Sequence, residues 1–128
     1  MPFVIVHGIF ESTATSTLTE LRRSIVASVS KTMGLPGVPV PASWIRPIFV
    51  RDMLGESEVE ADGCNTIYVR VDTAMFSGKF DEEDESWPLV VVSELAQVIW
   101  DAFGGRYEVE VFIGELNPKW KKLLKATS

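Results

Sequence analysis

The sequence predicts an α+β fold in which two β-α-β units form a four-stranded sheet with two helices on one face. Four short stretches are rich in Val, Ile, Phe and Tyr, which favour strands, and two longer stretches carry apolar residues at helical spacing. The stretches follow one another as strand, helix, strand, and this order occurs twice. Each unit is therefore expected to make a parallel strand pair with a right-handed helical crossover.

The composition is that of one globular domain, expected over 1–128, with a pseudo-repeat over 2–54 and 65–117. The chain has 128 residues, of which 46% are hydrophobic and 23% are charged. Its formal net charge of -6 repels polyphosphate, so we expect no nucleic-acid partner. No apolar stretch is long enough to span a membrane, and the first residues do not resemble a secretory leader. We therefore expect no membrane partner and a cytoplasmic location.

In the first unit, a strand is expected over 3–10, because this run is short and β-prone. Thr17 and Glu20 have the spacing of a capping box, which predicts the start of a helix that ends at Gly34. A proline-rich connection then leads to a second strand, expected over 44–51. A proline within this strand lacks a backbone donor, which favours the edge of the sheet or a bulge.

In the second unit, strands are expected over 65–73 and 107–113, because apolar and polar residues alternate in both. The helix between them is expected to start at Ser86 and to close at Gly104. With both helices on one face, the other face of the sheet is left uncovered. The strand residues available for that face are largely apolar, so we expect an oligomer that buries it.

Pro2 opens the first expected strand, directly after the initiator methionine. Removal of that methionine leaves a free secondary amine at Pro2. An α-amino group has a pKa near ~8 in model peptides, and partial burial lowers this pKa by disfavouring the ammonium form. Such an amine is neutral near pH 7 and can act as a general base. A retained Met1 would instead make the Pro2 nitrogen an amide, which is not a base.

A proline that opens the first strand, an arginine on the second strand and a repeated unit together resemble the tautomerase superfamily over nearly the whole chain. The resemblance includes 5-carboxymethyl-2-hydroxymuconate isomerase, whose terminal strand and turn are similar to the stretch 112–118, and macrophage migration inhibitory factor (MIF). Small uncharacterised bacterial proteins of the same fold, which also begin Met-Pro-Phe, are similar as well. The resemblance implies a homotrimer in which Pro2 is the general acid/base of a keto–enol tautomerase or isomerase. The implied substrate is a small 2-oxo or 2-hydroxydienoic acid, and no cofactor is implied.

The resemblance also implies which residues bind the carboxylate of the substrate. The stretch 43–48 looks like the second strand of the family and places Arg46 at its carboxylate-binding arginine. Arginine suits this task, because its planar fork donates two parallel hydrogen bonds and keeps its charge. Lys79 resembles the arginine of a Gly-Arg pair that follows the third strand in the muconate isomerases. Arg70, on the expected third strand, is the reserve candidate.

Some features of the sequence favour other interpretations. Short tautomerases carry a second arginine in the loop after the first strand, where this chain has Ser12. The alternative is therefore a non-catalytic oligomeric or ligand-binding protein of the same fold, and the element order alone also fits a ferredoxin-like regulatory domain. No metal site is expected from imidazole and thiolate ligands, because the chain has one histidine, His7, and one cysteine, Cys64.

Overall fold

The computed structural model describes residues 2–10, 12–34, 39–52, 66–73, 86–115, 122 and 124. The elements in chain order are β1 (Phe3–Ile9), α1 (Thr15–Met33), the 3₁₀ turn η1 (Ala42–Trp44), β2 (Arg46–Arg51), β3 (Thr66–Thr73), α3 (Ser86–Ala102) and β4 (Glu108–Glu115). Strand, helix and strand thus occur twice along the chain, which confirms the expected α+β class.

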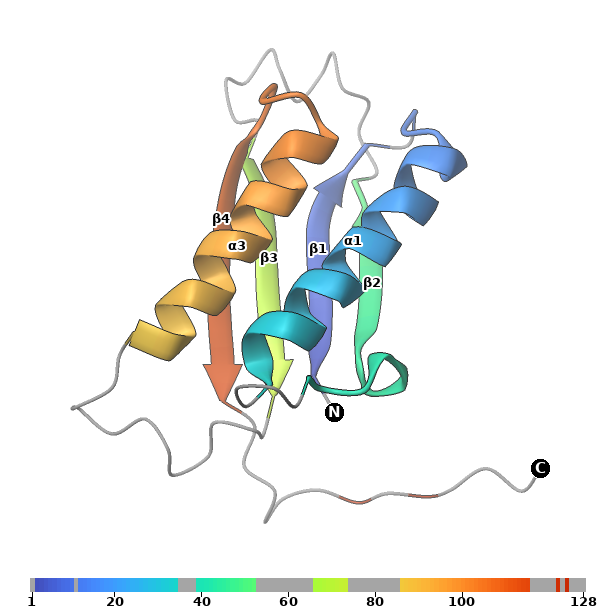
Figure 1. The fold of residues 1–128 in the computed structure, drawn as a ribbon. Coiled ribbons are helices and arrows are strands. Elements are labelled where there is room, and N and C mark those ends of the chain that lie inside the picture. Colours follow the sequence, from blue (N-terminus) through green and yellow to red (C-terminus); the bar gives the residue numbers. More distant parts are fainter. Residues whose placement is uncertain are drawn as a thin grey trace.

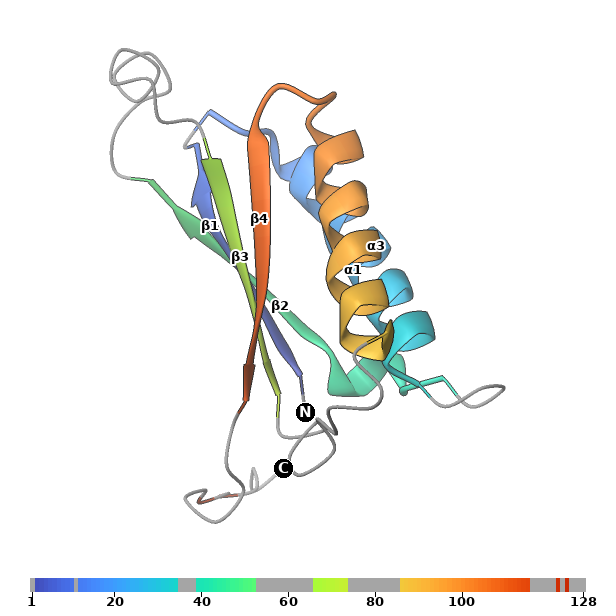
Figure 2. The same cartoon turned by 90° about the vertical axis from the view of Figure 1, so that its left-hand side faces the viewer.

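The strands form one four-stranded sheet in the order β2-β1-β3-β4. β1 pairs with β2 and β3 pairs with β4 in parallel, whereas the two central strands, β1 and β3, are antiparallel. Each helix therefore connects the two strands of a parallel pair. Both helices lie side by side on the same face of the sheet, and no described helix covers the other face (Figures 1 and 2). We call this other face the open face.

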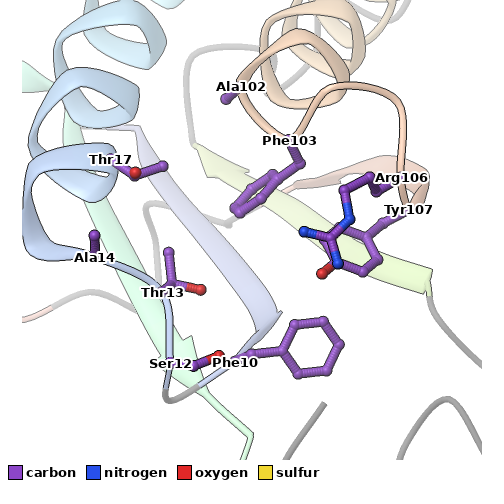
Figure 3. A pocket seen from close by; sticks show the side chains of 9 residues that line it. All are labelled: Phe10, Ser12, Thr13, Ala14, Thr17, Ala102, Phe103, Arg106 and Tyr107. Atoms are coloured by element: carbon purple, nitrogen blue, oxygen red, sulfur yellow. The ribbon is translucent and has the colours of Figure 1, made fainter. Parts of the chain in front are cut away.

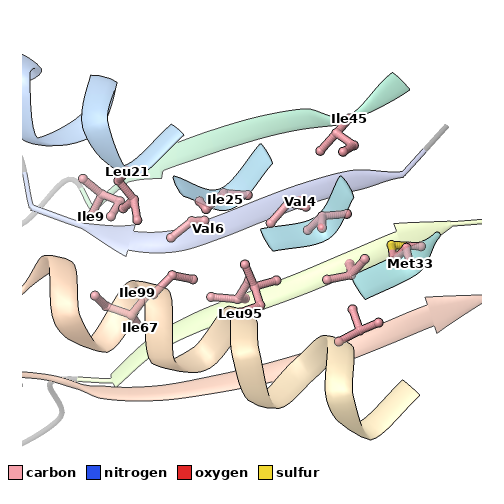
Figure 4. Packing of buried hydrophobic residues seen from close by; sticks show 14 of the residues in the cluster. Val4, Val6, Ile9, Leu21, Ile25, Met33, Ile45, Ile67, Leu95 and Ile99 are labelled. Atoms are coloured by element: carbon pink, nitrogen blue, oxygen red, sulfur yellow. The ribbon is translucent and has the colours of Figure 1, made fainter. Parts of the chain in front are cut away.

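The core lies between the helices and the covered face of the sheet (Figure 4). Its buried side chains recur every second residue in the strands and every fourth residue in the helices, so each element presents one apolar side. They include Val4, Val6, Leu21, Ile25, Val29, Met33, Ile67, Val69, Val71, Val91, Leu95 and Ile99. Removal of these side chains from water is the main term that stabilises the arrangement. Among the described residues, neither helix combines the length and apolar character needed to cross a membrane.

A bulge at Gly8 changes the alternation along β1. The pairing with β2 shifts between His7 and Ile9, and Gly8 has a φ of 91°, which side chains other than hydrogen rarely allow. A Cβ at this position would also lie 3.3 Å from the carbonyl oxygen of Thr66. The bulge directs Ile9 and Phe10 toward the core after Val6.

Several expected boundaries differ from those of the structure. α1 begins at Thr15, and its N-cap is Ala14, which offers no side-chain hydrogen bond, so the capping box at Thr17 was wrong. The run of hydroxyl residues before α1 contains several possible caps, and Thr19 Oγ1 instead donates to the carbonyl of Thr15 at 2.9 Å. Trp44, expected in a strand, belongs to η1.

The second strand begins after that turn. β2 lies at the edge of the sheet, as the proline at Pro47 predicted. In the second unit, β4 starts at Glu108, one residue later than expected. Cys64 lies outside the described residues.

Candidate functional site

Pro2 lies at the end of the sheet where β1 and β2 both begin. It is buried, and its carbonyl oxygen accepts a hydrogen bond of 3.0 Å from the backbone N–H of Arg46. Parallel strands start at the same end of a sheet, so the two residues meet although they are far apart in the sequence. The backbones of the two residues that the sequence resemblance placed in one site are therefore hydrogen-bonded to each other.

The surroundings of this end are apolar and fixed. Figure 1 shows the start of β1 close to η1. Met33, Val40 and Ile45 are buried there, with exposed fractions of 1%, 4% and 5%. Two hydrogen bonds hold the chain before η1 against α1: the N–H of Val40 donates to the Ser30 carbonyl at 3.0 Å, and Ser30 Oγ donates to the Val40 carbonyl at 2.6 Å. The chain around Pro2 is therefore apolar and fixed by backbone and side-chain hydrogen bonds.

Arg46 presents its side chain on the open face. A row of directly paired residues crosses the sheet at this end: Arg46, Phe3, Asp72 and Gly114. Directly paired residues share a face, so the Arg46 side chain lies on the same face as that of Asp72. The Arg46 side chain is exposed, and among the described residues it has no ion-pair partner. Its guanidinium is thus available to an anion at the Pro2 end of the open face.

Arg70 lies on the same face, one row further along, where it pairs with Ile5. Its Nε donates to Asp72 Oδ2 at 2.8 Å, and the two side chains are 43% and 16% exposed. A Cβ at Gly114 would lie only 2.5 Å from Asp72 Oδ1, so the glycine leaves the space that this carboxylate occupies. The charge of Arg70 is therefore partly neutralised within its own strand, which makes it a weaker anion ligand than Arg46.

The remaining sequence candidates do not add to this end of the sheet. Lys79 and Met1 lie outside the described residues. Ser12 follows β1 and therefore lies at the opposite end from Pro2. Among the described residues, no group of three or more His, Cys, Asp or Glu side chains could hold a metal ion.

The middle of the open face is aromatic and apolar. The ring centroid of Tyr68 lies 5.7 Å from that of His7 and 5.3 Å from that of Phe112. Tyr68 and Phe112 are 37% and 50% exposed, and Val50 on the edge strand is 38% exposed. His7 thus packs against an aromatic row on the open face. The exposed apolar side chains agree with the expectation that this face makes contacts with other subunits.

Sequence reasoning missed two features of the structure. Asp72 was not recognised as the partner of Arg70, although residues two apart on a strand share a face. A cavity at the other end of the sheet was also missed, because Phe10 and Tyr107, which line it, are far apart in the sequence.

Comparisons with known proteins match this chain by shape and not by sequence. No family model matches it, and no curated protein matches it. The asymmetric trimer of wild-type fused 4-OT has a TM-score of 0.67 and 13% identity, with 89% of this chain and 85% of that chain covered. A macrophage migration inhibitory factor-like protein from Entamoeba histolytica has a TM-score of 0.65 and 9% identity, with 95% and 94% covered.

A third match is malonate semialdehyde decarboxylase, whose structures include a proline-to-alanine mutant and concern decarboxylase and hydratase activities. It has a TM-score of 0.61 and 12% identity, with 96% of this chain and 91% of that chain covered. At these identities the matches establish a common fold. The agreement extends over nearly the full length of both chains, so the whole arrangement of two strand–helix–strand units is shared.

Proposed function

We propose that this chain, whose fold is that of the tautomerase superfamily, is a cofactor-independent keto–enol tautomerase with Pro2 as its general acid/base. The position of Pro2 carries the proposal. It is buried at the start of β1, tied through its carbonyl to the start of β2, and beside an arginine with an available guanidinium. The fold that the sequence resemblance implied is confirmed by the matched structures, which are tautomerase-superfamily members.

The proposed reaction needs the Pro2 nitrogen as a secondary amine, after removal of Met1. In its neutral form, the amine accepts a proton from the carbon next to the carbonyl, which leaves an enolate. The resulting ammonium then returns the proton to the enolate oxygen, and the reverse sequence converts enol to keto. Burial at this end lowers the pKa of the amine, because the charged form is poorly hydrated there. The amine is thereby available as a base near neutral pH.

Arg46 is the proposed ligand of the substrate carboxylate. Its guanidinium can donate two parallel hydrogen bonds and holds the acid at the Pro2 end of the open face. Asp72 pairs with Phe3, which in turn pairs with Arg46, so its carboxylate lies on the same face. This negative charge disfavours a second carboxylate on the substrate. We therefore propose a monocarboxylic 2-oxo acid as the substrate. Lys79, as a second cation, and Arg70, as a reserve ligand, stay predictions.

We further propose that the chain forms a homotrimer by burying its open face. Tyr68, Phe112 and Val50 on this face are more than one-third exposed in the single chain, as apolar side chains at a subunit interface would be. The similar fused 4-OT structure is a trimer. Such an assembly would place a second subunit beside Pro2 and Arg46 and complete the walls of the site.

The alternative is a ligand-binding protein of the same fold without catalysis. It is favoured by the ion pair of Arg70 with Asp72, which leaves Arg46 as the one described cation available at this end. The two functions differ in the state of the N-terminus. A catalyst needs Pro2 as the first residue, whereas a binding protein can retain Met1.

The test combines an intact-mass measurement with the variant Pro2→Ala. We expect the purified protein to lack Met1 and to ketonise the enol of phenylpyruvate, which is a monocarboxylic 2-oxo acid. In Pro2→Ala, kcat should fall by about 100-fold or more, which is the typical contribution of a general acid/base. In the parent protein, kcat/KM should rise with pH as the amine loses its proton. Light scattering should give the mass of a trimer for both the parent and the variant. Retention of Met1, or an unchanged rate in Pro2→Ala, would exclude the catalytic role.

A further inference from the structure

An exposed tryptophan lies at the Pro2 end of the sheet and has no part in the function proposed above. Trp44 is the last residue of the 3₁₀ turn η1, and its side chain is 50% exposed. Single exposed apolar side chains are ordinary on protein surfaces. What Trp44 can do therefore depends on its position relative to Pro2 and Arg46.

Backbone hydrogen bonds on both sides fix the position of Trp44. Its N–H donates to the Pro41 carbonyl at 3.0 Å, and the N–H of Arg46 donates to the Pro2 carbonyl at 3.0 Å. Between the two donors, Ile45 has an extended backbone, with φ of -100° and ψ of 123°, and is only 5% exposed. The Ile45 side chain thus lies in the core, whereas the two side chains that flank it are exposed to solvent.

The level of Pro2 along the sheet falls between the levels of Trp44 and Arg46. Phe3 pairs with Arg46 in parallel register. The residues before them are therefore level as well, which places Pro2 beside Ile45. An extended chain rises about 3.3 Å per residue, so the backbones of Trp44 and Arg46 are about 7 Å apart along the strand. Pro2 is thus flanked by a guanidinium-bearing residue on one side and an indole-bearing residue on the other.

This order is the order of the groups in a 2-oxo acid. The carboxylate comes first, then the carbonyl carbon and the carbon that exchanges its proton, and then the side chain. With the carboxylate on Arg46 and the exchanging carbon at the Pro2 nitrogen, the side chain of the acid extends toward Trp44. An indole ring offers a large apolar surface on which an aromatic side chain can stack or which it can meet edge to face.

We propose that Trp44 is a specificity-determining residue that binds the side chain of the substrate and favours 2-oxo acids with an aromatic ring. The inference rests on the function proposed for Pro2 and Arg46, and it narrows the substrate from monocarboxylic 2-oxo acids to aromatic ones. An aliphatic acid such as 2-oxobutanoate reaches Arg46 and Pro2 in the same way but leaves the indole uncovered. The contact between two rings therefore separates the two classes of acid.

A cavity of about 300 Å³ at the opposite end of the sheet offers a competing place for an aromatic ring (Figure 3). Phe10, Phe103 and Tyr107 are among its lining residues. Phe10 follows β1 whereas Pro2 precedes it, so a ring in this cavity lies a whole strand away from Pro2. Ala102 also lines the cavity, and Ala102→Phe would fill it. This variant therefore distinguishes the two places.

The first test measures binding without turnover. Hydrocinnamate, which is phenylpyruvate with a methylene in place of the carbonyl, is titrated into the full chain by calorimetry. We expect saturable binding, and in Trp44→Ala the dissociation constant should rise by about 10-fold because the ring contact is lost. Trp44→Phe, which keeps a ring, should restore most of the affinity.

Two controls belong to this titration. Trp100→Ala is matched to Trp44→Ala, because Trp100 is 45% exposed but lies on α3, which covers the other face of the sheet. The affinity for hydrocinnamate should be unchanged in Trp100→Ala and in Ala102→Phe. Thermal unfolding checks that each variant is folded.

The second test compares two substrates. The ratio of kcat/KM for the enol of phenylpyruvate to that for the enol of 2-oxobutanoate should fall by about 10-fold in Trp44→Ala, with the value for 2-oxobutanoate unchanged. The inference is overturned if Trp44→Ala lowers both values equally, if hydrocinnamate shows no saturable binding, or if its affinity changes in Ala102→Phe and not in Trp44→Ala. A parent protein without turnover whose hydrocinnamate binding still depends on Trp44 would reject the role of Pro2 and support that of Trp44 in binding.

Discussion

The two ends of the sheet have the same construction but opposite chemistry. At one end Phe3 of β1 pairs with Arg46 of β2, and at the other Thr66 of β3 pairs with Glu108 of β4. Thr66 Oγ1 donates to Glu108 Oε2 at 3.3 Å, whereas Arg46 has no ion-pair partner among the described residues. The repeated unit thus preserves the strand pairing and not the residues that face solvent. Among the residues that the structure describes, only the Pro2 end offers a cation on the open face next to the start of a strand.

The other end has its own arginine, on the helix side of the sheet. Arg106 precedes β4 and lies over Tyr107 at the edge of the cavity. The side chains of the two arginines therefore lie on different sides of the sheet. Arg46 lies on the open face, and Arg106 lies over Tyr107 beside the cavity. The two arginines therefore differ in their position relative to the sheet, and only Arg46 belongs to the proposed catalytic site.

The largest effect is expected for Arg46→Glu. This variant puts a glutamate at the Pro2 end, where the opposite end has Glu108. Loss of two charge-assisted hydrogen bonds and a new repulsion should lower kcat/KM for a 2-oxo acid by about 100-fold or more. Arg46→Lys, which keeps the charge without the fork, should lose about 10-fold. Steady-state kinetics measure both. A variant Arg46→Glu with the kinetics of the parent would show that the two ends do not differ in the proposed way.

The two helices also end differently, and Gly105→Ala tests that difference. α1 ends on Gly34 in an extended conformation, whereas α3 is followed by Gly104 and Gly105 with φ of 63° and 72°. A Cβ at Gly105 would lie 2.9 Å from Trp100 Cζ2, but one at Gly104 meets nothing within 4 Å.

We therefore expect Gly105→Ala to lower the free energy of unfolding by about 2 kcal/mol or more, from backbone strain and steric overlap. Gly104→Ala is the matched control and should cost about 1 kcal/mol, from backbone strain alone. Urea denaturation measures both values. Equal losses in the two variants would mean that the Trp100 ring moves aside without cost.

Glu108→Gln is expected to have the smallest effect. The carboxylate is exposed and its hydrogen bond with Thr66 is long, so the free energy of unfolding should change by less than about 0.5 kcal/mol. The kinetics should stay those of the parent, because this end has no proposed role in the reaction. A loss of activity similar to that of Arg46→Glu would indicate that both ends contribute to catalysis.

Periodicity predicted much of the fold. Val4 and Val6 alternate with partly exposed residues in β1, and Leu21 and Ile25 recur at helical spacing in α1, as their burial requires. The start of α1 could not be predicted, since a run of Ser and Thr offers several equivalent caps. Trp44 lies in η1 because the 3₁₀ turn bonds Trp44 to the Pro41 carbonyl, a local choice that residue preference for strands did not reveal.

The candidate site was predictable only in part. The family resemblance placed Pro2 and Arg46 in one site, and the parallel pairing of β1 with β2 brings their backbones together. The pair formed by Arg70 and Asp72 depends on rotamers, which the sequence does not specify. Tertiary packing alone brings together the rings of Phe10, Phe103 and Tyr107, so no local sequence pattern predicts this cluster.

The covalent link between the two strand–helix–strand units has a consequence for how the molecule can change. In an association of two identical short chains, every substitution appears twice, once on each side of the symmetry axis. Here both members of the central antiparallel pair, β1 and β3, belong to one chain, so a substitution alters one end and leaves the other as it was. One end can therefore acquire or lose a ligand without any compromise at its counterpart.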